Sequence, residues 1–293
     1  MTKKKVVVVG NCQARPIAAL LEQMSDQVEV IKVAIVHLLN KTNEEEYRQA
    51  FRDADFIIAQ LVAPNYPCEF VRTVALKELY PKKVITIVNL FYAGYTPDWF
   101  YIRRPNFGTL RGPMGDYHNK TIFKAWLERK TKSEAMALVT DKSFNSQEYL
   151  PIVHKSLVEL KNREQEADVK IAYYIEENYL KRRLFFTFNH PSKELLVEYT
   201  KQVLIFLDII VTVDSDIDMR EPLNQFIPQV NVAVPISIDR ADNYKGSSVL
   251  TVDGWNVDVH GSEIYSLRGL VDVFYSIYSQ NETELDLLSK NLL

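Results

Sequence analysis

The residues best placed to do chemistry are Gly10-Asn11-Cys12-Gln13, directly after the apolar run Val6–Val9. Apolar residues at helical spacing follow from Ile17, so the sequence predicts a strand, a turn and a helix over residues 5–24. Open parallel sheets bind ligands beyond the carboxyl ends of their strands, where unpaired helix N–H groups favour anions. A helix N-terminus also tends to lower the pKa of a cysteine and make Cys12 nucleophilic. The alternative is that Cys12 is a small buried filler in an ordinary turn.

A second candidate cluster lies in residues 112–119, before an expected helix. Asp116 and His118 are two residues apart, so in extended chain their side chains leave on the same side. A carboxylate that orients an imidazole makes a competent general base. The alternative is that Asp116 or Asn119 caps the following helix.

Polar residues also follow three other apolar runs. His190 and Asn189 come after Leu184–Phe188 and before a helix, while Gln60 and Asn89 end two expected strands. The carboxyl ends of parallel strands lie at one edge of the sheet, which places these residues beside the Gly10–Gln13 turn. For His190 alone, a structural role is the alternative.

The remaining histidines and the second cysteine show no chemical pattern. His37 and His154 lie on apolar stretches, which indicates packed or surface residues, and His260 is expected to be exposed. Cys68 is interpreted as structural. No HExxH or CxxC spacing occurs, so we expect no metal site, and the first turn lacks both GxGxxG and a Walker A lysine.

The elements that must position these residues alternate in the first 90 residues. Four apolar runs separated by helical segments predict a mostly parallel sheet, with strands at 6–9, 28–36, 56–62 and 84–90. Residues 91–115 are irregular, and residues 116–183 read as mainly helical. The spacing further predicts a capping box at Asn145 and Glu148, a hairpin around Asp253-Gly254 and a last helix over 262–279. We therefore expect an α/β domain over 1–115 and a mainly helical region over 116–293, with a single domain that contains both as the alternative.

Bulk composition narrows the class of protein. The 293 residues carry 35 Lys and Arg against 38 Asp and Glu, a net charge of −3 that argues against nonspecific nucleic-acid binding. Two cysteines indicate a reducing compartment rather than a disulfide framework. The first apolar run is too short for a signal peptide, and no run approaches the ~20 apolar residues of a membrane span. We expect a cytoplasmic protein.

Several of these motifs together resemble one family. In chain order they are Gly10–Ala14 after the valine strand, Ala54–Gln60, Tyr95–Asp98, Gly115–His118 and Thr187–Pro191. This series resembles the WcbI-type polysaccharide acetyltransferases of bacterial capsule biosynthesis over roughly residues 5–235, whereas the hairpin at 248–260 has no counterpart. The resemblance implies an open Rossmann-like or SGNH-like α/β sheet, coenzyme A binding and O-acetylation of a glycan sugar. Cys12 stands where SGNH hydrolases carry serine, and Asp116 and His118 depart from their Asp-x-x-His spacing.

The resemblance allows two chemical routes. In the favoured one, Cys12 takes the acyl group from acyl-coenzyme A, and His118 or His190 activates the sugar hydroxyl. In the other, a histidine activates the hydroxyl for direct attack, and the backbone of Cys12 joins Asn11, Gln13 or Asn89 in an oxyanion hole.

Substrate contacts follow from the same implication. Gln60 and Asn189 are also expected to contact the substrate, a glycan or nucleotide-sugar. The expected contacts to coenzyme A, whose phosphates suit arginine forks, are Gly10, Arg15, Arg103, Arg104, Arg111, Lys181, Arg182 and Arg183. The alternatives are an SGNH-like esterase or deacetylase and a non-catalytic coenzyme A- or nucleotide-binding protein.

Overall fold

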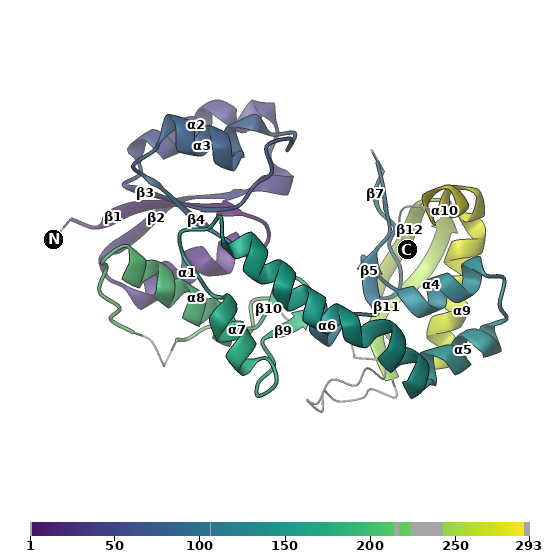
Figure 1. Cartoon of the computed structure of the whole chain (residues 1–293). Coiled ribbons are helices and arrows are strands. Elements are labelled where there is room, and N and C mark those ends of the chain that lie inside the picture. The colour runs from purple at the N-terminus through teal and green to yellow at the C-terminus, as the bar shows by residue number, and fades with distance from the viewer. Residues whose placement is uncertain (1, 106, 214–216, 224–242, 290–293) are drawn as a thin grey trace. The chain divides into compact units, whose positions relative to one another are not determined.

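The structure is a computed structural model that describes residues 2–105, 107–213, 217–223 and 243–289 (Figure 1). The chain divides into two compact units. Unit 1 comprises residues 1–92 and 156–225, and unit 2 comprises residues 93–155 and 226–293. Both units are discontinuous in sequence, and the boundary expected at residue 115 stays a prediction.

Unit 1 is built on a parallel four-stranded sheet in the order β2-β1-β3-β4. The strands are β1 (Lys4–Gly10), β2 (Val28–Ile35), β3 (Phe56–Gln60) and β4 (Val84–Ile87). Helices α2 (Glu44–Asp53) and α3 (Thr73–Leu79) cover one face, and α1 (Ala14–Met24) and α8 (Lys193–Phe206) cover the other (Figure 1). The open parallel α/β sheet expected from the sequence is confirmed.

The apolar patterns explain why these elements form. All four residues of Val6–Val9 are buried, as expected for a strand covered on both faces. Helix α1 buries a stripe of apolar residues at helical spacing against the sheet, namely Ile17, Leu20, Leu21 and Met24. The register pairs Gly10 with Ile35, Val9 with Ala59, and Gln60 with Ile87, so the carboxyl ends of the strands lie at one edge.

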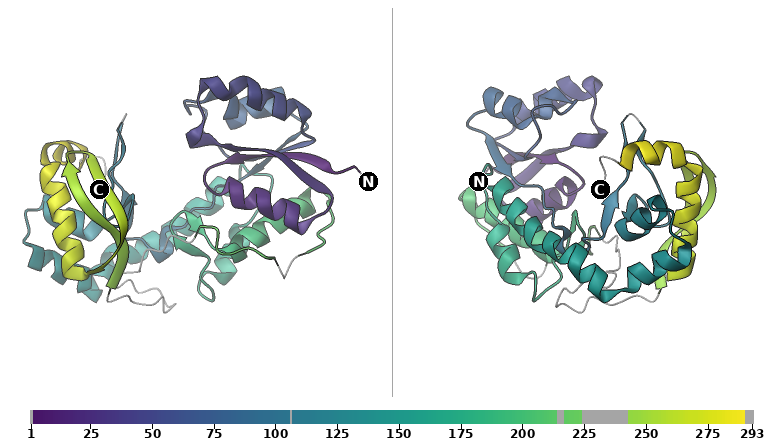
Figure 2. Two further views of the ribbon diagram at one scale, coloured as in Figure 1. Left: turned by 180° about the vertical axis from the view of Figure 1, so that it is seen from behind. Right: turned by 45° about the vertical axis from the view of Figure 1, so that its right-hand side comes forward.

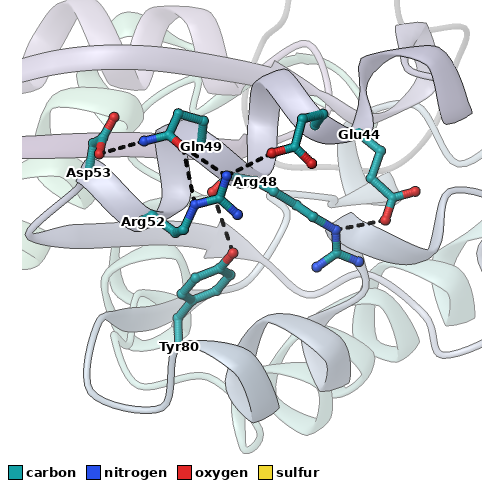
Figure 3. Close-up of polar contacts among 7 residues, drawn as sticks. Glu44, Arg48, Gln49, Arg52, Asp53 and Tyr80 are labelled. Carbon is teal, nitrogen blue, oxygen red and sulfur yellow. Dashed lines mark hydrogen bonds and ion pairs between the residues drawn. The ribbon is translucent and has the colours of Figure 1, made fainter.

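Helix α2 shows how the outer layer is held. Phe51 is fully buried, whereas the other face carries polar contacts at the surface, including the partly buried contact of Arg48 Nε with Glu44 Oε1 at 2.7 Å (Figure 3). The Tyr80 hydroxyl donates to the carbonyl of Arg48 at 3.5 Å. Exposed ion pairs contribute about 0–1 kcal/mol each, so burial of the apolar face dominates.

Shorter elements complete unit 1. They are the 3₁₀ turns η1 (Val36–Leu38), η2 (Lys41–Asn43) and η3 (Glu69–Val71), helix α7 (Ala172–Asn178), and strands β9 (Phe185–Thr187) and β10 (His190–Pro191). Ser192 caps α8, because its hydroxyl oxygen accepts the N–H of Leu195 at 3.3 Å. Helix α6 (Lys142–Glu164) begins in unit 2 and ends in unit 1.

Unit 2 combines small antiparallel pairs with helices around an aromatic core. Strand β5 (Trp99–Tyr101) pairs with β8 (Tyr117–Asn119), and β6 (Arg103–Arg104) pairs with β7 (Gly108–Thr109). The hairpin of β11 (Asn243–Asp253) and β12 (Asn256–Ser266) packs against α9 (Figure 2). The remaining elements are η4 (Ala93–Tyr95), α4 (Lys120–Leu127), α5 (Lys132–Thr140), α9 (Leu267–Gln280) and α10 (Glu282–Ser289).

Two local predictions in the second half are wrong. Helix α6 begins at Lys142 with Asp141 Oδ1 accepting two backbone N–H groups. The amide of Asn145 is buried inside the helix and donates to the carbonyls of Val139 and Asp141, so it forms no capping box. The last helix begins at Leu267 rather than 262, because residues 263–266 pair with β11.

The predicted hairpin is confirmed, and it is longer than expected. Asp253 pairs with Asn256, which leaves Gly254 and Trp255 as the two loop residues. Gly254 has φ +52°, a value that favours glycine. Within the part of the chain that the structure describes, no helix has the length and apolar character to cross a membrane.

Candidate functional site

The site begins at Gly10, the last residue of β1. A Cβ atom at Gly10 would lie 2.6 Å from Gln60 Oε1, so only glycine allows this close approach. Gln60 Oε1 in turn accepts the N–H of Asn11 at 2.9 Å, and Asn11 Oδ1 accepts the N–H of Gln13 at 2.9 Å. The turn into α1 is therefore fixed from the neighbouring strand.

The side chain of Gln13 is the centre of a buried hydrogen-bond network. It is fully buried, and its Nε2 donates to the carbonyls of Leu90 at 2.7 Å and Asn189 at 2.9 Å. Its Oε1 accepts from Gln60 Nε2 at 2.8 Å and from the N–H of Leu90 at 3.0 Å. Gln13 thus joins the carboxyl ends of β1 and β3, the segment after β4, and the β9–β10 connection.

Arg163, which the sequence did not single out, holds the segment after β4. Its guanidinium donates to Asn89 Oδ1 at 2.8 Å and to the carbonyls of Asn89 and Phe91 at 3.1 Å each. It belongs to the mixed-charge run at 161–183 that reads as a solvated helix face. From the sequence alone, nothing in that run distinguishes Arg163 from its exposed neighbours.

The thiol of Cys12 is half-buried at the start of α1. Burial raises the pKa of Cys12, because desolvation disfavours the thiolate. Hydrogen bonding from the backbone N–H groups of Cys12 and Gln13 lowers the pKa but is the smaller effect. The expectation of a lowered pKa is therefore wrong: the helix N-terminus acts in the predicted direction, and burial outweighs it.

Cys12 opens onto a cavity of about 480 Å³ at the carboxyl edge of the sheet. This volume lies within the range of roughly 300–1,000 Å³ typical of small-molecule sites. The charged or titratable groups on the wall besides Cys12 are Arg15, His37, Arg220 and Glu221. The rest of the wall consists of Pro16, Ala19, Ile35, Leu38, Met219, Pro222 and Leu223.

Two of these wall residues were missed from the sequence. His37 was interpreted as a packed or surface histidine, since it lies on an apolar stretch of the chain. The strand register brings His37 close to the Cys12 turn, because Ile35, two residues before His37, pairs with Gly10, two residues before Cys12. Arg220 lies beyond α8 in a segment with no recognisable pattern, and only the tertiary structure identifies it.

His190 also belongs to unit 1. Its backbone N–H donates to Thr187 Oγ1 at 3.1 Å, and Thr187 Oγ1 donates to Asn189 Oδ1 at 3.0 Å. Burial lowers the pKa of His190 to about 4, so its imidazole is neutral at neutral pH. Because Asn189 bonds to Gln13, the structure places His190 one residue from the network that fixes the Cys12 turn.

His118 lies in the core of unit 2. It is fully buried, its Nδ1 lies 3.0 Å from the Tyr278 hydroxyl, and its Nε2 lies 3.0 Å from the carbonyl of Leu110. Burial lowers the pKa of His118 to about 4. The expected pairing of His118 with Asp116 is wrong, because both ring nitrogens have other partners. Asp116 is exposed and interacts with the charges of Arg111 and Arg103.

The alternative helix-capping interpretation holds for Asn119. Its Oδ1 accepts the N–H of Ile122 at 3.1 Å at the start of α4. Its Nδ2 donates to the buried Asp98 at 2.8 Å. His118 and Asn119 therefore serve the packing of unit 2 in this structure.

The expected cations lie in both units. In unit 1, Arg15 lines the Cys12 cavity, and Arg182 forms an ion pair with Glu194 at 2.6 Å. Lys181 and Arg183 are neighbours of Arg182 in the same unit. In unit 2, Arg103 lies over the ring of Tyr101 at 4.6 Å, Arg104 lies over Phe107 at 3.9 Å, and Arg111 is exposed. Among the residues described by the structure, no cluster of three or more His, Cys, Asp or Glu side chains could hold a metal ion.

Comparison with known protein families identifies a class of enzymes that build polysaccharides. A family model described as "Polysaccharide biosynthesis enzyme WcbI" matches residues 5–210. The chain therefore belongs to the WcbI family of polysaccharide biosynthesis enzymes, and the resemblance noted from the sequence motifs is confirmed. A search of curated proteins finds no match.

A solved structure of WcbI, described as a novel polysaccharide biosynthesis enzyme, shares the fold. It is 17% identical in sequence, with a TM-score of 0.74, and the match covers 98% of this chain and 93% of that one. That structure is described as the native protein without a disulfide bond between coenzyme A and one of its cysteines.

Proposed function

We propose that this enzyme is an acyl-coenzyme A-dependent O-acetyltransferase that acts on a sugar of a bacterial surface polysaccharide. The observation that carries the proposal is the cavity at the carboxyl edge of the sheet, which holds the Cys12 thiol beside two guanidinium groups. A thiol can accept an acyl group from a thioester, and guanidinium groups suit phosphates.

The wall of the cavity fits coenzyme A in its chemistry. Arg15 and Arg220 can contact phosphate groups, and the apolar side chains, such as Ile35 and Met219, can contact the alkyl part of the pantetheine arm. The description of the related structure, which names coenzyme A and a cysteine together, supports the same ligand. In this proposal the cations of unit 2 are not needed for phosphate binding.

The hydrogen bonds in the turn favour the covalent route through Cys12. An oxyanion hole needs donors free to face the substrate. The N–H groups of Asn11 and Gln13 already donate to Gln60 and Asn11, and the Gln13 amide donates to two carbonyls. We therefore infer that these groups hold the turn in place and that the sulfur of Cys12 accepts the acyl group.

The second half of the reaction needs a base for the sugar hydroxyl. We assign this role to His190, because it directly follows Asn189, whose carbonyl accepts from the Gln13 side chain in the network that fixes the Cys12 turn. His118 is given a structural role, since its ring nitrogens are both engaged within the core.

The proposal is tested with the purified full chain and coenzyme A. Saturating coenzyme A should raise the melting temperature, since a ligand at 100 times its Kd stabilises the native state by about 2.7 kcal/mol. Incubation with acetyl-coenzyme A should add one acetyl group, seen by intact mass, to the wild type and to Cys68→Ala but not to Cys12→Ala.

Three outcomes would contradict parts of this proposal. No thermal shift with coenzyme A would argue against the transferase, and ester hydrolysis without a coenzyme A effect would indicate an esterase. Full acetyl transfer to a sugar by Cys12→Ala would exclude the covalent route.

A further inference from the structure

The cavity wall contains an imidazole whose role the proposed function leaves open. His37 lies in the turn η1, directly after β2, and its side chain lines the same cavity as the Cys12 thiol. It is solvent-exposed as a residue, so it is available for proton exchange. On the described wall, the only other group that could accept a proton besides the thiol is the carboxylate of Glu221.

The register of the sheet places His37 and Cys12 at equivalent positions after two neighbouring strands. Strands β1 and β2 are parallel neighbours, and their last pair is Gly10 with Ile35. Cys12 and His37 each follow that pair by two residues. Adjacent strands lie about 4.8 Å apart, so the two chain segments leave the sheet side by side, and both side chains face the cavity.

The thiol needs a proton acceptor at this place. Burial raises the pKa of Cys12, so the thiol is protonated at neutral pH, whereas the thiolate is the nucleophile. Once formed, the thiolate is stabilised by the backbone N–H groups of Cys12 and Gln13. The turn itself offers no side chain that can accept this proton, because the amides of Gln13 and Gln60 are hydrogen-bonded to each other.

We propose that His37 is the general base that removes the proton from the Cys12 thiol. The inference rests on the proposed covalent function. A ring nitrogen of His37 takes the thiol proton while the sulfur attacks the carbonyl carbon of an acyl thioester. The new bond joins that carbon to Cys12 sulfur, the bond to the donor sulfur breaks, and the departing thiolate takes the proton back from His37. No oxidant, reductant or further reactant is consumed.

The other charges that face this pair come from two elements. Arg15 projects from α1, and Arg220 and Glu221 belong to the segment at 217–223. A guanidinium favours the thiolate and opposes the imidazolium, and a carboxylate has the opposite effects. Transfer of the proton from sulfur to nitrogen leaves the net charge of the wall unchanged.

The test uses p-nitrophenyl acetate, an activated ester that needs only a nucleophile and a base. The rate of acetylation of Cys12 is followed by intact mass in the wild type and in His37→Ala. We expect the variant to react about 100-fold more slowly, the lower end of what a positioned base contributes. Added imidazole should raise the rate in His37→Ala by a much larger factor than in the wild type, where its own reaction with the ester sets the background. His154→Ala, which removes an exposed histidine from α6, is the matched control and should match the wild type.

The same experiment separates this inference from the proposed function. A rate for His37→Ala within twofold of the wild type would overturn the role of His37, and so would a folded variant that imidazole does not rescue. His37→Gln, which keeps a polar side chain of similar size, guards against a local packing effect and should show the same loss. If acetyl-coenzyme A fails to acetylate the wild type while the ester reaction depends on His37, the coenzyme A proposal fails and the role of His37 stands.

Discussion

Replacing Gln13 by leucine should be among the most destabilising single changes in unit 1. Leucine keeps a similar length and a good helix propensity, but it cannot form hydrogen bonds. Four groups would lose a partner inside the protein: the N–H and carbonyl of Leu90, the carbonyl of Asn189 and the amide of Gln60.

The size of the effect follows from these four groups. A buried polar group without a partner costs about 1–3 kcal/mol. At the low end of that range, Gln13→Leu lowers the free energy of unfolding of unit 1 by about 4 kcal/mol, a large part of the roughly 5–15 kcal/mol of a typical domain. Each 1.4 kcal/mol is a factor of about ten in an equilibrium constant, so the opening equilibrium should shift about 1,000-fold.

Hydrogen exchange followed by mass spectrometry measures this shift in unit 1 by itself. Peptides that cover β1 and β4 should lose about 1,000-fold of their protection in Gln13→Leu. The control is Gln23→Leu, the same change on the exposed face of α1, which should alter the free energy by less than about 0.5 kcal/mol. Protection in Gln13→Leu equal to that in Gln23→Leu would refute the reasoning.

Gln60→Leu provides a further check on the network. It removes one partner of Gln13 and the acceptor of the Asn11 N–H, so it should cost about 2 kcal/mol. The double variant should cost less than the sum of the two single variants, because both remove the same Gln13–Gln60 bond. Strict additivity would show that the two amides are not coupled.

Three other changes give testable outcomes. Gly10→Ala must displace the pinned side chain of Gln60 and should cost more than about 2 kcal/mol in urea denaturation; a neutral effect would contradict the close approach. His118→Phe leaves the buried Tyr278 hydroxyl without its partner and should cost about 2 kcal/mol, with Cys12 acetylation by p-nitrophenyl acetate unchanged. Burial raises the pKa of Asp98 to about 7, so the folded state holds a proton that the unfolded state has released. The free energy of unfolding should therefore fall by about 2 kcal/mol from pH 5 to pH 8 in urea denaturation, and Asp98→Asn should lack that part of the fall.

The sequence predicted the sheet well because its strands are buried on both faces. A continuous apolar run such as Val6–Val9 is stable where both of its faces are buried, as in a central parallel strand. The apolar residues of α1 recur at helical spacing because one face of that helix packs on the same core. Predictions that depended on a single local signal were weaker. Asn145 and Glu148 have the spacing of a capping box, yet α6 had already begun because Asp141 caps it four residues earlier.

The position of the candidate site could also be predicted. A turn of Gly, Asn, Cys and Gln after the first strand must lie at the carboxyl edge of a parallel sheet, whatever the rest of the chain does. The ionisation of Cys12 could not be predicted, because it depends on how much surrounding protein removes water from the sulfur. The same holds for His118, whose partner Tyr278 is 160 residues away in the chain.

The sequence by itself determined the parallel sheet, the glycine-cysteine turn at its edge and the family to which the chain belongs, because these depend on local pattern and order. Only the tertiary structure decided that Gln13 and Gln60 hold the turn, that His37 and Arg220 share the cavity of Cys12, and that His118 belongs to the core. The physical reason is that hydrogen-bond partners and desolvation arise from residues distant in sequence, and no local periodicity encodes which of them meet.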